Sequence, residues 1–588
     1  MTTFALRRSL RLCVAGLGLA AGTAAQDSFD IDLLLGPEPG VGFEFGRATC
    51  IVDVDKDGFD DVVALQSGAS NGPIDWSGKG WVFYGPNLES WTSFSARDPA
   101  EEEYLGGGGC CTGDVNGDGW TDLLVGSPDY IDEGKQDAGR AHVFLGPAFD
   151  VDIALHDPFP EAGASMGDHG LLLLDVDADG MDDVFVGCIR HDQRLPDGTI
   201  VEDSGRVYLW LAKQLLGAGG LASLTIIDNP TPADGATFGW FLLRLPAADG
   251  TQILASAPLT PVGLFEGAIH MLDAATLAPI GFIEPPSAAP QVVTVGSFGT
   301  AIASGMLGPN DEFGLLVQSE STYLAVGGVG CNNAGAAFVL TGLDFNQLAY
   351  TLVSPQACND DKQHFGTRAM VLDVDRDGQE DLVINDPSKR DEDLVRIFWG
   401  PDYAAFETLG AGFTPVVTSG FGSYLAHGDI DADGFDEIAV FTYFIGAFGG
   451  LYIHDWRTLT SNVESLSIAA GGDADFTLDL SPAQAGKTYL AALGISGSDP
   501  GTIAGKGSYV PLNLDAVTFA GLALLGSPLL EDFTGSLDAD GRATFSLHLP
   551  GGFPAPLAGS TLTVAAVVVD PGGRPGAGSS PVEIELVP

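Results

Sequence analysis

Residues 53–61 read Asp53-Val54-Asp55-Lys56-Asp57-Gly58-Phe59-Asp60-Asp61, and this D-x-D-x-D-G-x-x-D pattern decides the fold because it returns four more times in the same local context. Acids at positions 1, 3, 5 and 9 supply hard oxygen ligands, and the residue at position 7 can offer its carbonyl. Glycine at position 6 permits the sharp turn that folds these groups around one ion. The pattern therefore predicts a calcium-binding loop.

The five loops together supply the candidate metal ligands. Loop by loop these are Asp53, Asp55, Asp57, Phe59 and Asp61; Asp114, Asn116, Asp118, Trp120 and Asp122; Asp175, Asp177, Asp179, Met181 and Asp183; Asp373, Asp375, Asp377, Gln379 and Asp381; Asp429, Asp431, Asp433, Phe435 and Glu437. Mutual repulsion of these acids would oppose folding without a cation. We expect about five structural Ca²⁺ ions, since Mg²⁺ prefers stricter octahedral geometry and keeps its water.

These loops are not EF-hands. An EF-hand needs a bidentate acid at position 12, where this chain has apolar residues: Ala64, Val125, Val186, Ile384 and Val440. Each loop runs directly into a strand pattern such as Val62–Leu65. The sequence therefore predicts that each loop joins two strands.

The net negative charge of the chain argues against polyanionic partners. The chain of 588 residues has 79 Asp and Glu against 25 Lys and Arg, so a nucleic acid or an anionic membrane surface would be repelled. The loops account for much of the acidity as cation ligands, and an acidic solubilising surface accounts for the rest.

The N-terminus has the composition of an export signal. Residues 1–25 contain three arginines, an apolar run from Leu12 to Ala21 and the small residues Thr23–Ala25, which is typical of a secretory signal peptide. The most apolar later stretch, residues 516–530, is interrupted by glycine and proline. We therefore expect an exported, soluble chain that is secreted, cell-surface or periplasmic, without a transmembrane anchor.

A second motif sets the repeat. An aromatic or apolar residue followed by glycine precedes each loop by eight or nine positions: Phe45-Gly46, Leu105-Gly106, Met166-Gly167, Phe365-Gly366 and Phe421-Gly422. Phe238-Gly239 and Phe298-Gly299 begin two further copies that lack the acids. This gives seven units of about 56 to 72 residues.

These motifs, with Gly126-Ser127-Pro128 after a second strand, resemble the FG-GAP repeat family, whose best-known members are the integrin alpha-subunit N-terminal propellers. The resemblance covers roughly residues 29–457 and implies one four-stranded blade per repeat, hence seven blades arranged radially. Seven fourth-strand patterns precede the seven FG motifs. The first of them, Phe29–Leu35, would complete blade seven and close the ring.

The expected fold is all-β: a seven-bladed β-propeller (29–457) after the signal peptide (1–25), followed by a small C-terminal β-sandwich (461–588). Alternating runs such as Phe476–Leu480 and Thr561–Val569 suggest the sandwich. Asp538–Gly541 imitates the calcium loop but lacks the acid at position 9, and we interpret it as a plain turn.

No catalytic constellation is apparent. Gly163–Gly167 matches the G-x-S-x-G nucleophile elbow, which implies acyl hydrolysis only between a strand and a helix, and no helix pattern follows. The glycine run Gly106–Gly109 fits a crowded propeller axis better than a phosphate cradle. We expect a non-enzymatic, monomeric binding or adhesion module for an unknown protein or glycan ligand. The alternatives are a polysaccharide-active, lyase-like enzyme on a propeller scaffold and a structural cell-surface component.

Two finer expectations concern the connections. The six cysteines after the signal allow 15 pairings. Cys331 and Cys358 fall on connections that leave the same face of blade five, so we expect these two to form a disulfide. The long loops 67–79, 129–138 and 189–204 lie between second and third strands, so the ligand is expected on the face opposite the calcium loops.

Overall fold

The computed structural model describes most of the chain after residue 28. The described residues are 29–38, 44–217, 224–247, 250–262, 265–286, 292–309, 312–326, 329–331, 333–355, 364–387, 394–410, 420–445, 448–456, 458–480, 484–498, 501–504, 508–552, 557–569 and 575–588. The predicted signal peptide lies outside them.

Seven four-stranded antiparallel sheets follow one another along the chain and are consistent with propeller blades. In hydrogen-bonding order they are β2 (Phe45–Val52), β3 (Asp61–Gln66), β4 (Lys79–Phe83), β5 (Trp91–Phe94); β6 (Cys110–Gly113), β7 (Asp122–Ser127), β8 (Arg140–Leu145), β9 (Val151–His156); β10 (Met166–Leu174), β11 (Asp183–Cys188), β14 (Arg206–Trp210), β15 (Leu224–Asp228); β16 (Leu242–Ala247), β17 (Gly250–Val262), β18 (Phe265–Asp273), β19 (Pro279–Ile283); β21 (Phe298–Gly308), β22 (Glu312–Ser319), β25 (Ala336–Thr341), β26 (Gln347–Leu352); β27 (Ala369–Leu372), β28 (Asp381–Asp386), β29 (Leu394–Phe398), β30 (Phe406–Leu409); and β31 (Leu425–Gly428), β32 (Glu437–Ile445), β33 (Phe448–Trp456), β1 (Phe29–Leu34).

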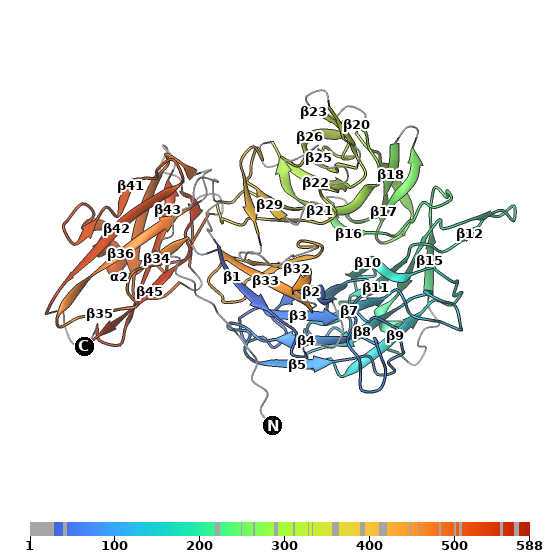
Figure 1. Cartoon of the computed structure of the whole chain (residues 1–588), viewed down its shortest axis with the longest axis horizontal. Coiled ribbons are helices and arrows are strands. Elements are labelled where there is room, and N and C mark those ends of the chain that lie inside the picture. Colours follow the sequence, from blue (N-terminus) through green and yellow to red (C-terminus); the bar gives the residue numbers. More distant parts are fainter. Residues whose placement is uncertain are drawn as a thin grey trace.

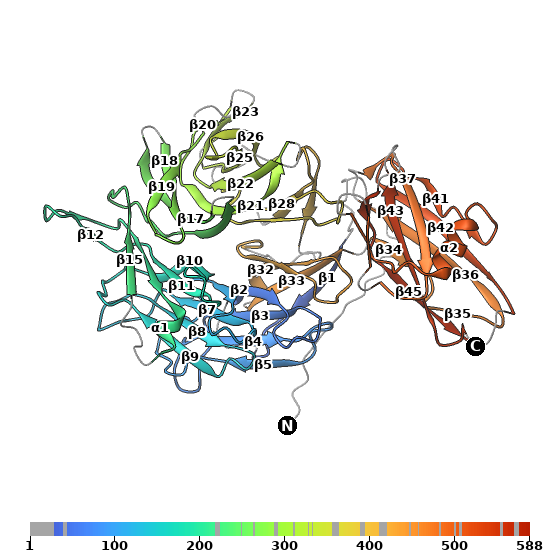
Figure 2. The ribbon, with the colours of Figure 1, turned by 180° about the vertical axis from the view of Figure 1, so that it is seen from behind.

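The last sheet is completed by the first strand of the chain. β1 pairs antiparallel with β33, in a register that runs from Phe29 opposite Trp456 to Leu34 opposite Leu451. The first strands of successive sheets contact one another in chain order, and β31 contacts β2, so the series of sheets closes on itself (Figures 1 and 2). The predicted pairing of this segment with the seventh unit is confirmed.

Apolar side chains fill the space between neighbouring sheets. Val63 and Leu65 of β3 pack in one cluster with Leu123 and Val125 of β7. Where the first strands crowd together there is no room for a side chain, since a Cβ added at Gly108 would lie 1.9 Å from the Gly167 carbonyl oxygen. The glycine run after Leu105 thus serves close approach of the backbones.

Two small sheets and a short helix are inserted in the connections. Within the loop 189–204, β12 (Gln193–Arg194) pairs with β13 (Ile200–Val201) as a hairpin that projects from the edge of the molecule in both views (Figures 1 and 2). A three-stranded sheet contains β20 (Val292–Thr294), β23 (Tyr323–Val326) and β24 (Val329–Cys331), and α1 (Ala212–Leu215) follows β14.

The strands after β33 form one curled, mixed sheet that resembles a half-barrel, and we call residues 458–588 the C-terminal unit. Its strands are β34 (Leu459–Ser461), β35 (Ser465–Ser467), β36 (Gly471–Asp479), β37 (Thr488–Gly494), β40 (Leu530–Glu531), β41 (Thr534–Ser536), β42 (Arg542–Pro550), β43 (Thr561–Val569), β44 (Pro575–Gly578) and β45 (Val582–Val587). A hairpin of β38 (Thr502–Ala504) with β39 (Ser508–Val510) and helix α2 (Ala516–Ala523) complete it.

This unit departs from the expected antiparallel sandwich. β35 and β45 pair in parallel, and this pairing makes all ten strands one hydrogen-bonded sheet. Alternating apolar residues predict strands with one buried face, but they do not specify whether that face packs on a second sheet or on the inside of the same curled sheet. Asp538–Gly541 is a turn, as expected, in which Asp538 Oδ1 accepts from the backbone N–H groups of Asp540 and Arg542.

The structure gives one disulfide pair and one further bonded cysteine. Cys50 and Cys110 are bonded and join β2 to β6, the first strands of neighbouring sheets, while Cys111 and Cys188 are free thiols. Cys331 is disulfide-bonded; its predicted partner Cys358 lies outside the described residues.

Peptide mapping under non-reducing conditions tests this pattern. We expect a Cys50–Cys110 peptide pair and a Cys331–Cys358 peptide pair, with Cys111 and Cys188 recovered as free thiols and Cys188, which is buried, alkylated only after unfolding. Recovery of Cys331 and Cys358 as free thiols from the oxidised protein would refute the second pair.

Candidate metal centres

Each of the five acidic loops connects the first and second strands of its sheet, as predicted. Two backbone positions make the turn tight. Position 6 is a left-handed glycine, with φ of 97° at Gly58 and 92° at Gly434, and position 4 is also left-handed, with φ of 61° at Lys56 and 53° at Arg376. A side chain at position 6 would be strained, which explains the glycine in every copy.

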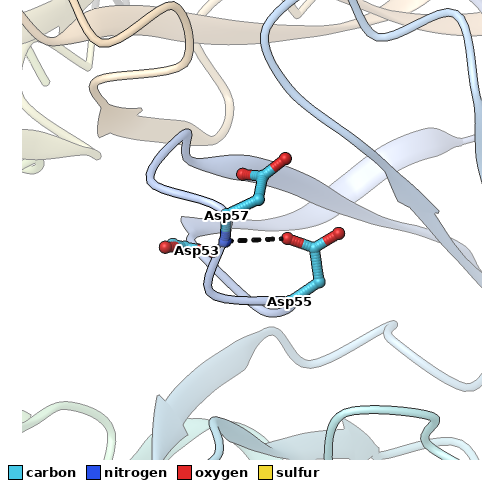
Figure 3. A group of neighbouring side chains, drawn as sticks. All are labelled: Asp53, Asp55 and Asp57. Atoms are coloured by element: carbon cyan, nitrogen blue, oxygen red, sulfur yellow. Dashed lines mark hydrogen bonds between the residues drawn. The ribbon is translucent and has the colours of Figure 1, made fainter.

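Backbone N–H groups inside the loop hold the carboxylates of positions 1, 3 and 5. In the first loop, Asp53 accepts from the N–H groups of Asp57 at 3.2 Å and Gly58 at 3.1 Å. Asp55 accepts from the Asp57 N–H at 3.2 Å (Figure 3), and Asp57 accepts from Phe59 at 3.0 Å. The fourth loop repeats the position-1 bonds at 2.9 and 2.8 Å. The chain thus shapes the acidic loop with its own backbone.

Acids gather closely enough to share one cation in most of the loops. Groups of three, with ligand atoms within 4.8 Å of one another, are Asp53, Asp55 and Asp57; Asp175, Asp177 and Asp183; Asp373, Asp375 and Asp381; Asp429, Asp431 and Glu437; and Asp431, Asp433 and Asp455. The second loop forms no such three-acid group among the residues described, and its Asn116 accepts from the Asp118 N–H at 2.9 Å. A metal there, and the carbonyl ligands expected at position 7, stay predictions.

The position-9 acid has a structural role that the motif did not reveal. One oxygen of Asp61 accepts from the Val54 N–H at 3.0 Å within the loop, and the other accepts from the Gly85 N–H at 2.9 Å, just after the third strand. Asp122, Asp183 and Asp381 repeat both bonds. This carboxylate therefore ties the loop to the end of β4 or its counterpart while it can still present lone pairs to a cation.

Position 8 and β33 supply acids that we did not predict. Asp60 accepts from the Asp429 N–H at 2.9 Å, and Asp182 accepts from the Asp114 N–H at 2.9 Å, so acids at position 8 connect loops of neighbouring sheets. The signal was present, since four of the five copies have Asp or Glu at this position. Asp455 lies on β33, outside any motif.

Burial makes the loops unfavourable places for uncompensated negative charge. It raises the pKa of Asp61, Asp122 and Asp183 to about 6 each, with neighbouring loop carboxylates adding to the effect. In the fifth loop, burial and then the charge of Asp431 raise the pKa of Asp433 to about 9 and of Glu437 to about 11. A bound cation would remove this penalty.

The donor set fits Ca²⁺. Asp375 Oδ1 and Glu437 Oε1 are buried without a hydrogen-bond partner, on side chains that are each only 3% exposed and belong to the acid groups above. Unpartnered buried carboxylate oxygens are costly, and several hard oxygens on a flexible loop suit Ca²⁺. The loop acids would hold the ion, which would supply the missing positive charge.

Comparison with protein families supports the FG-GAP resemblance inferred from the motifs. An FG-GAP repeat matches residues 107–144 and an FG-GAP-like repeat matches residues 53–125. Phosphatidylinositol-glycan-specific phospholipase D of Mus musculus is 29% identical over 160 residues, 26% of this chain and 18% of that protein. Integrin alpha pat-2 of Caenorhabditis briggsae is 32% identical over 159 residues, 24% and 12% of the two chains. The chain thus contains FG-GAP repeats, is distantly similar to both proteins, and spans under a fifth of their length.

Similar solved structures include the extracellular domain of a one-component system from B. thetaiotaomicron, with a TM-score of 0.36 and 8% identity over 95% of this chain and 58% of that one. The six-bladed β-propeller lectin of Aleuria aurantia has a TM-score of 0.29 and 10% identity over 69% of this chain and 91% of the lectin. At these scores neither likeness carries an argument. In the described part of the chain, no helix is long and apolar enough to cross a membrane.

The first prediction for the loops concerns content and stability. The mature protein should hold about five Ca²⁺, and chelation should lower its melting temperature, since each site contributes about 2.7 kcal/mol at a hundredfold excess over its Kd if the unfolded chain does not bind. Asp377→Ala should remove one ion and leave the others. Elemental analysis that finds no calcium, together with melting unchanged by EDTA, would contradict this.

The second prediction concerns pH. The raised pKa values mean that the folded, calcium-free protein binds protons more tightly than the unfolded chain, so its stability falls as pH rises from about 4 through 6. Calcium relieves that loss. The increase in melting temperature on adding calcium to decalcified protein should therefore be larger at about pH 7.5 than at about pH 5. An equal increase at both pH values would show that these carboxylates are not the groups the ion neutralises.

Proposed function

We propose that this FG-GAP repeat protein is an exported, calcium-stabilised, seven-bladed β-propeller that acts as a binding or adhesion module for a protein or glycan. Support for a binding role comes chiefly from the long connections that leave the face opposite the acidic loops. The sheets are antiparallel, so connections between second and third strands emerge at the end remote from the calcium loops.

The β12–β13 hairpin is the most extended of these connections. Its strands pair Gln193 with Val201 and Arg194 with Ile200, and Ile200 is 56% exposed. The base is fixed, since Gln193 accepts from the Ser204 hydroxyl at 3.0 Å and the Asp192 N–H donates to Glu161 at 2.9 Å. An exposed tip on a rigid base is the usual arrangement of a recognition loop.

Exposed aromatic side chains lie on connections of the same face. Trp76, in the loop between β3 and β4, is 47% exposed and stacks on Tyr104 with ring centroids 6.2 Å apart. Phe159, between β9 and β10, is 58% exposed. Large, rigid aromatic rings are enriched where proteins bind partners, and they are also suited to stacking on sugar rings. These residues extend the candidate surface over the first three sheets.

We propose no catalytic role. Ser165 of the G-x-S-x-G match donates to the Gly163 carbonyl, and strand β10 follows it in place of a helix. A cavity of about 370 Å³ between β15 and β18–β19 has Asp228 in its lining, whose carboxylate already pairs with Arg206 at 2.9 Å. The two relatives match about a quarter of this chain and under a fifth of their own length, so their activities do not transfer to this chain. The high net negative charge favours a partner other than nucleic acid.

The test is a loop replacement. A screen of the purified protein against glycans and surface proteins identifies a ligand, and residues 189–204 are then replaced by a short glycine-containing turn. Calcium content and melting temperature should stay near those of the parent while ligand binding is lost, because the hairpin lies away from the metal loops.

The matched control is Lys56→Ala, an exposed position on the calcium face that is not a proposed ligand, and it should leave binding unchanged. A shortened protein that binds as well as the parent would show that the ligand does not use this loop.

A further inference from the structure

The five acidic loops differ in their exposure. The first three each contain solvent-exposed residues, at 55–58, at 117–119, and at 177, 178 and 180, whereas every residue of the fourth and fifth loops is buried or half-buried. The motif is nearly the same in all five loops, so the difference in exposure comes from what lies against the fourth and fifth. In both ribbon views the C-terminal unit lies beside the last two sheets, which carry the fourth and fifth loops (Figures 1 and 2).

Backbone hydrogen bonds join the fourth loop to the C-terminal unit. The Tyr509 N–H donates to the Arg376 carbonyl at 3.0 Å, and the Gly578 N–H donates to the Asp375 carbonyl at 3.1 Å. The Asp375 carboxylate is also held, since Gln484 Nε2 donates to its Oδ2 at 3.1 Å. One acid of the predicted metal set is therefore in direct contact with the other unit.

The fifth loop meets the same part of the C-terminal unit through packing. The Tyr509 ring lies edge-on to the Phe435 ring, with centroids 5.9 Å apart. It also lies over Gly434, where an added Cβ would be 2.2 Å from the Tyr509 ring. Phe435 and Trp456 share one continuous apolar core with Phe476 and Phe545 of the C-terminal unit. Positions 6 and 7 of the loop thus form part of the contact surface.

The shape of this surface depends on how eight acids are neutralised. Among the described residues, Arg376 pairs with Asp436 at 2.8 Å and the charge of Lys487 acts on Asp377. Positions 1, 3, 5 and 9 of these two loops hold eight acids. Asp375 Oδ1 and Glu437 Oε1 have no hydrogen-bond partner, and each lies on a side chain that is 97% buried and belongs to an acid group whose ligand atoms are within 4.8 Å of one another. These oxygens mark where cations would complete the interface.

We infer that the ions of the fourth and fifth loops hold the C-terminal unit against the last two sheets, so that calcium controls a contact between the two parts of the chain. This inference rests on the proposed calcium binding. With the ions present, the loops present the carbonyls of Asp375 and Arg376 and the Phe435 ring in a fixed arrangement. Without them, repulsion among the carboxylates spreads the loops and breaks the bonds to Tyr509 and Gly578.

Hydrogen–deuterium exchange at these two amides reports the contact directly. On removal of calcium, peptides containing Tyr509 and Gly578 should exchange faster, by about 5- to 150-fold, the usual range for coupling between two sites. Asp375→Asn keeps the size of the side chain and an acceptor for Gln484 but removes its charge, and it should produce the same increase in saturating calcium. The matched control, Asp55→Asn, changes the same position of the exposed first loop and should not.

A second variant leaves the loops unchanged. Tyr509→Ala removes the ring that covers Gly434 and Phe435, and because coupling is reciprocal it should weaken calcium binding at two sites and leave the others as in the parent. A calcium titration identical to that of the parent would overturn the inference, as would equal exchange in Asp375→Asn and Asp55→Asn.

Failure of this inference is distinguishable from failure of the proposed calcium binding. If elemental analysis shows that chelation removes the ions while exchange at Tyr509 and Gly578 does not change, calcium binding stands and the coupling is wrong. If the protein contains no calcium, both fail.

Discussion

The structure depends on one electrostatic constraint: each acidic loop must hold three or four carboxylates within a single tight turn. Backbone N–H groups at positions 5, 6 and 7 satisfy some of the oxygens, and the position-9 acid accepts from a backbone N–H within the loop and from another just after the third strand. These hydrogen bonds fix the geometry but leave the charge. A bound cation would reconcile the closeness and partial burial of these acids with a stable fold.

The second constraint is that an array of sheets must not leave open edges. Here the first strand, β1, pairs with β33, so the seventh sheet contains both ends of the repeat region and the series of sheets is closed. The Cys50–Cys110 disulfide and the position-8 bond from Asp60 to the Asp429 N–H connect the first sheet to its two neighbours. Closure therefore brings a loop from the start of the repeats beside one from their end.

The sequence was sufficient for the features that repeat. The FG motifs and acidic loops predicted the strand order, the connection that holds each loop and the pairing of residues 29–34, because periodic motifs determine local structure and its register. The sequence was insufficient where the architecture depends on pairing between strands far apart in the chain. The parallel β35–β45 pair, which replaces the expected sandwich, depends on strands more than 100 residues apart. Asp455 and Gln484 approach the loops only in the folded chain, and no local pattern marks them.

The central claim is that the acids of these loops are organised around Ca²⁺ and fold with it. Anomalous diffraction from crystals grown in calcium tests this most directly, because it locates each ion as well as counting the ions. The account predicts anomalous peaks within coordination distance, about 2.3–2.6 Å, of the loop carboxylates, including peaks beside Asp375 and Glu437 in the loops that the C-terminal unit covers. Well-ordered loops without peaks, with protonated or lysine-paired acids in their place, would contradict it.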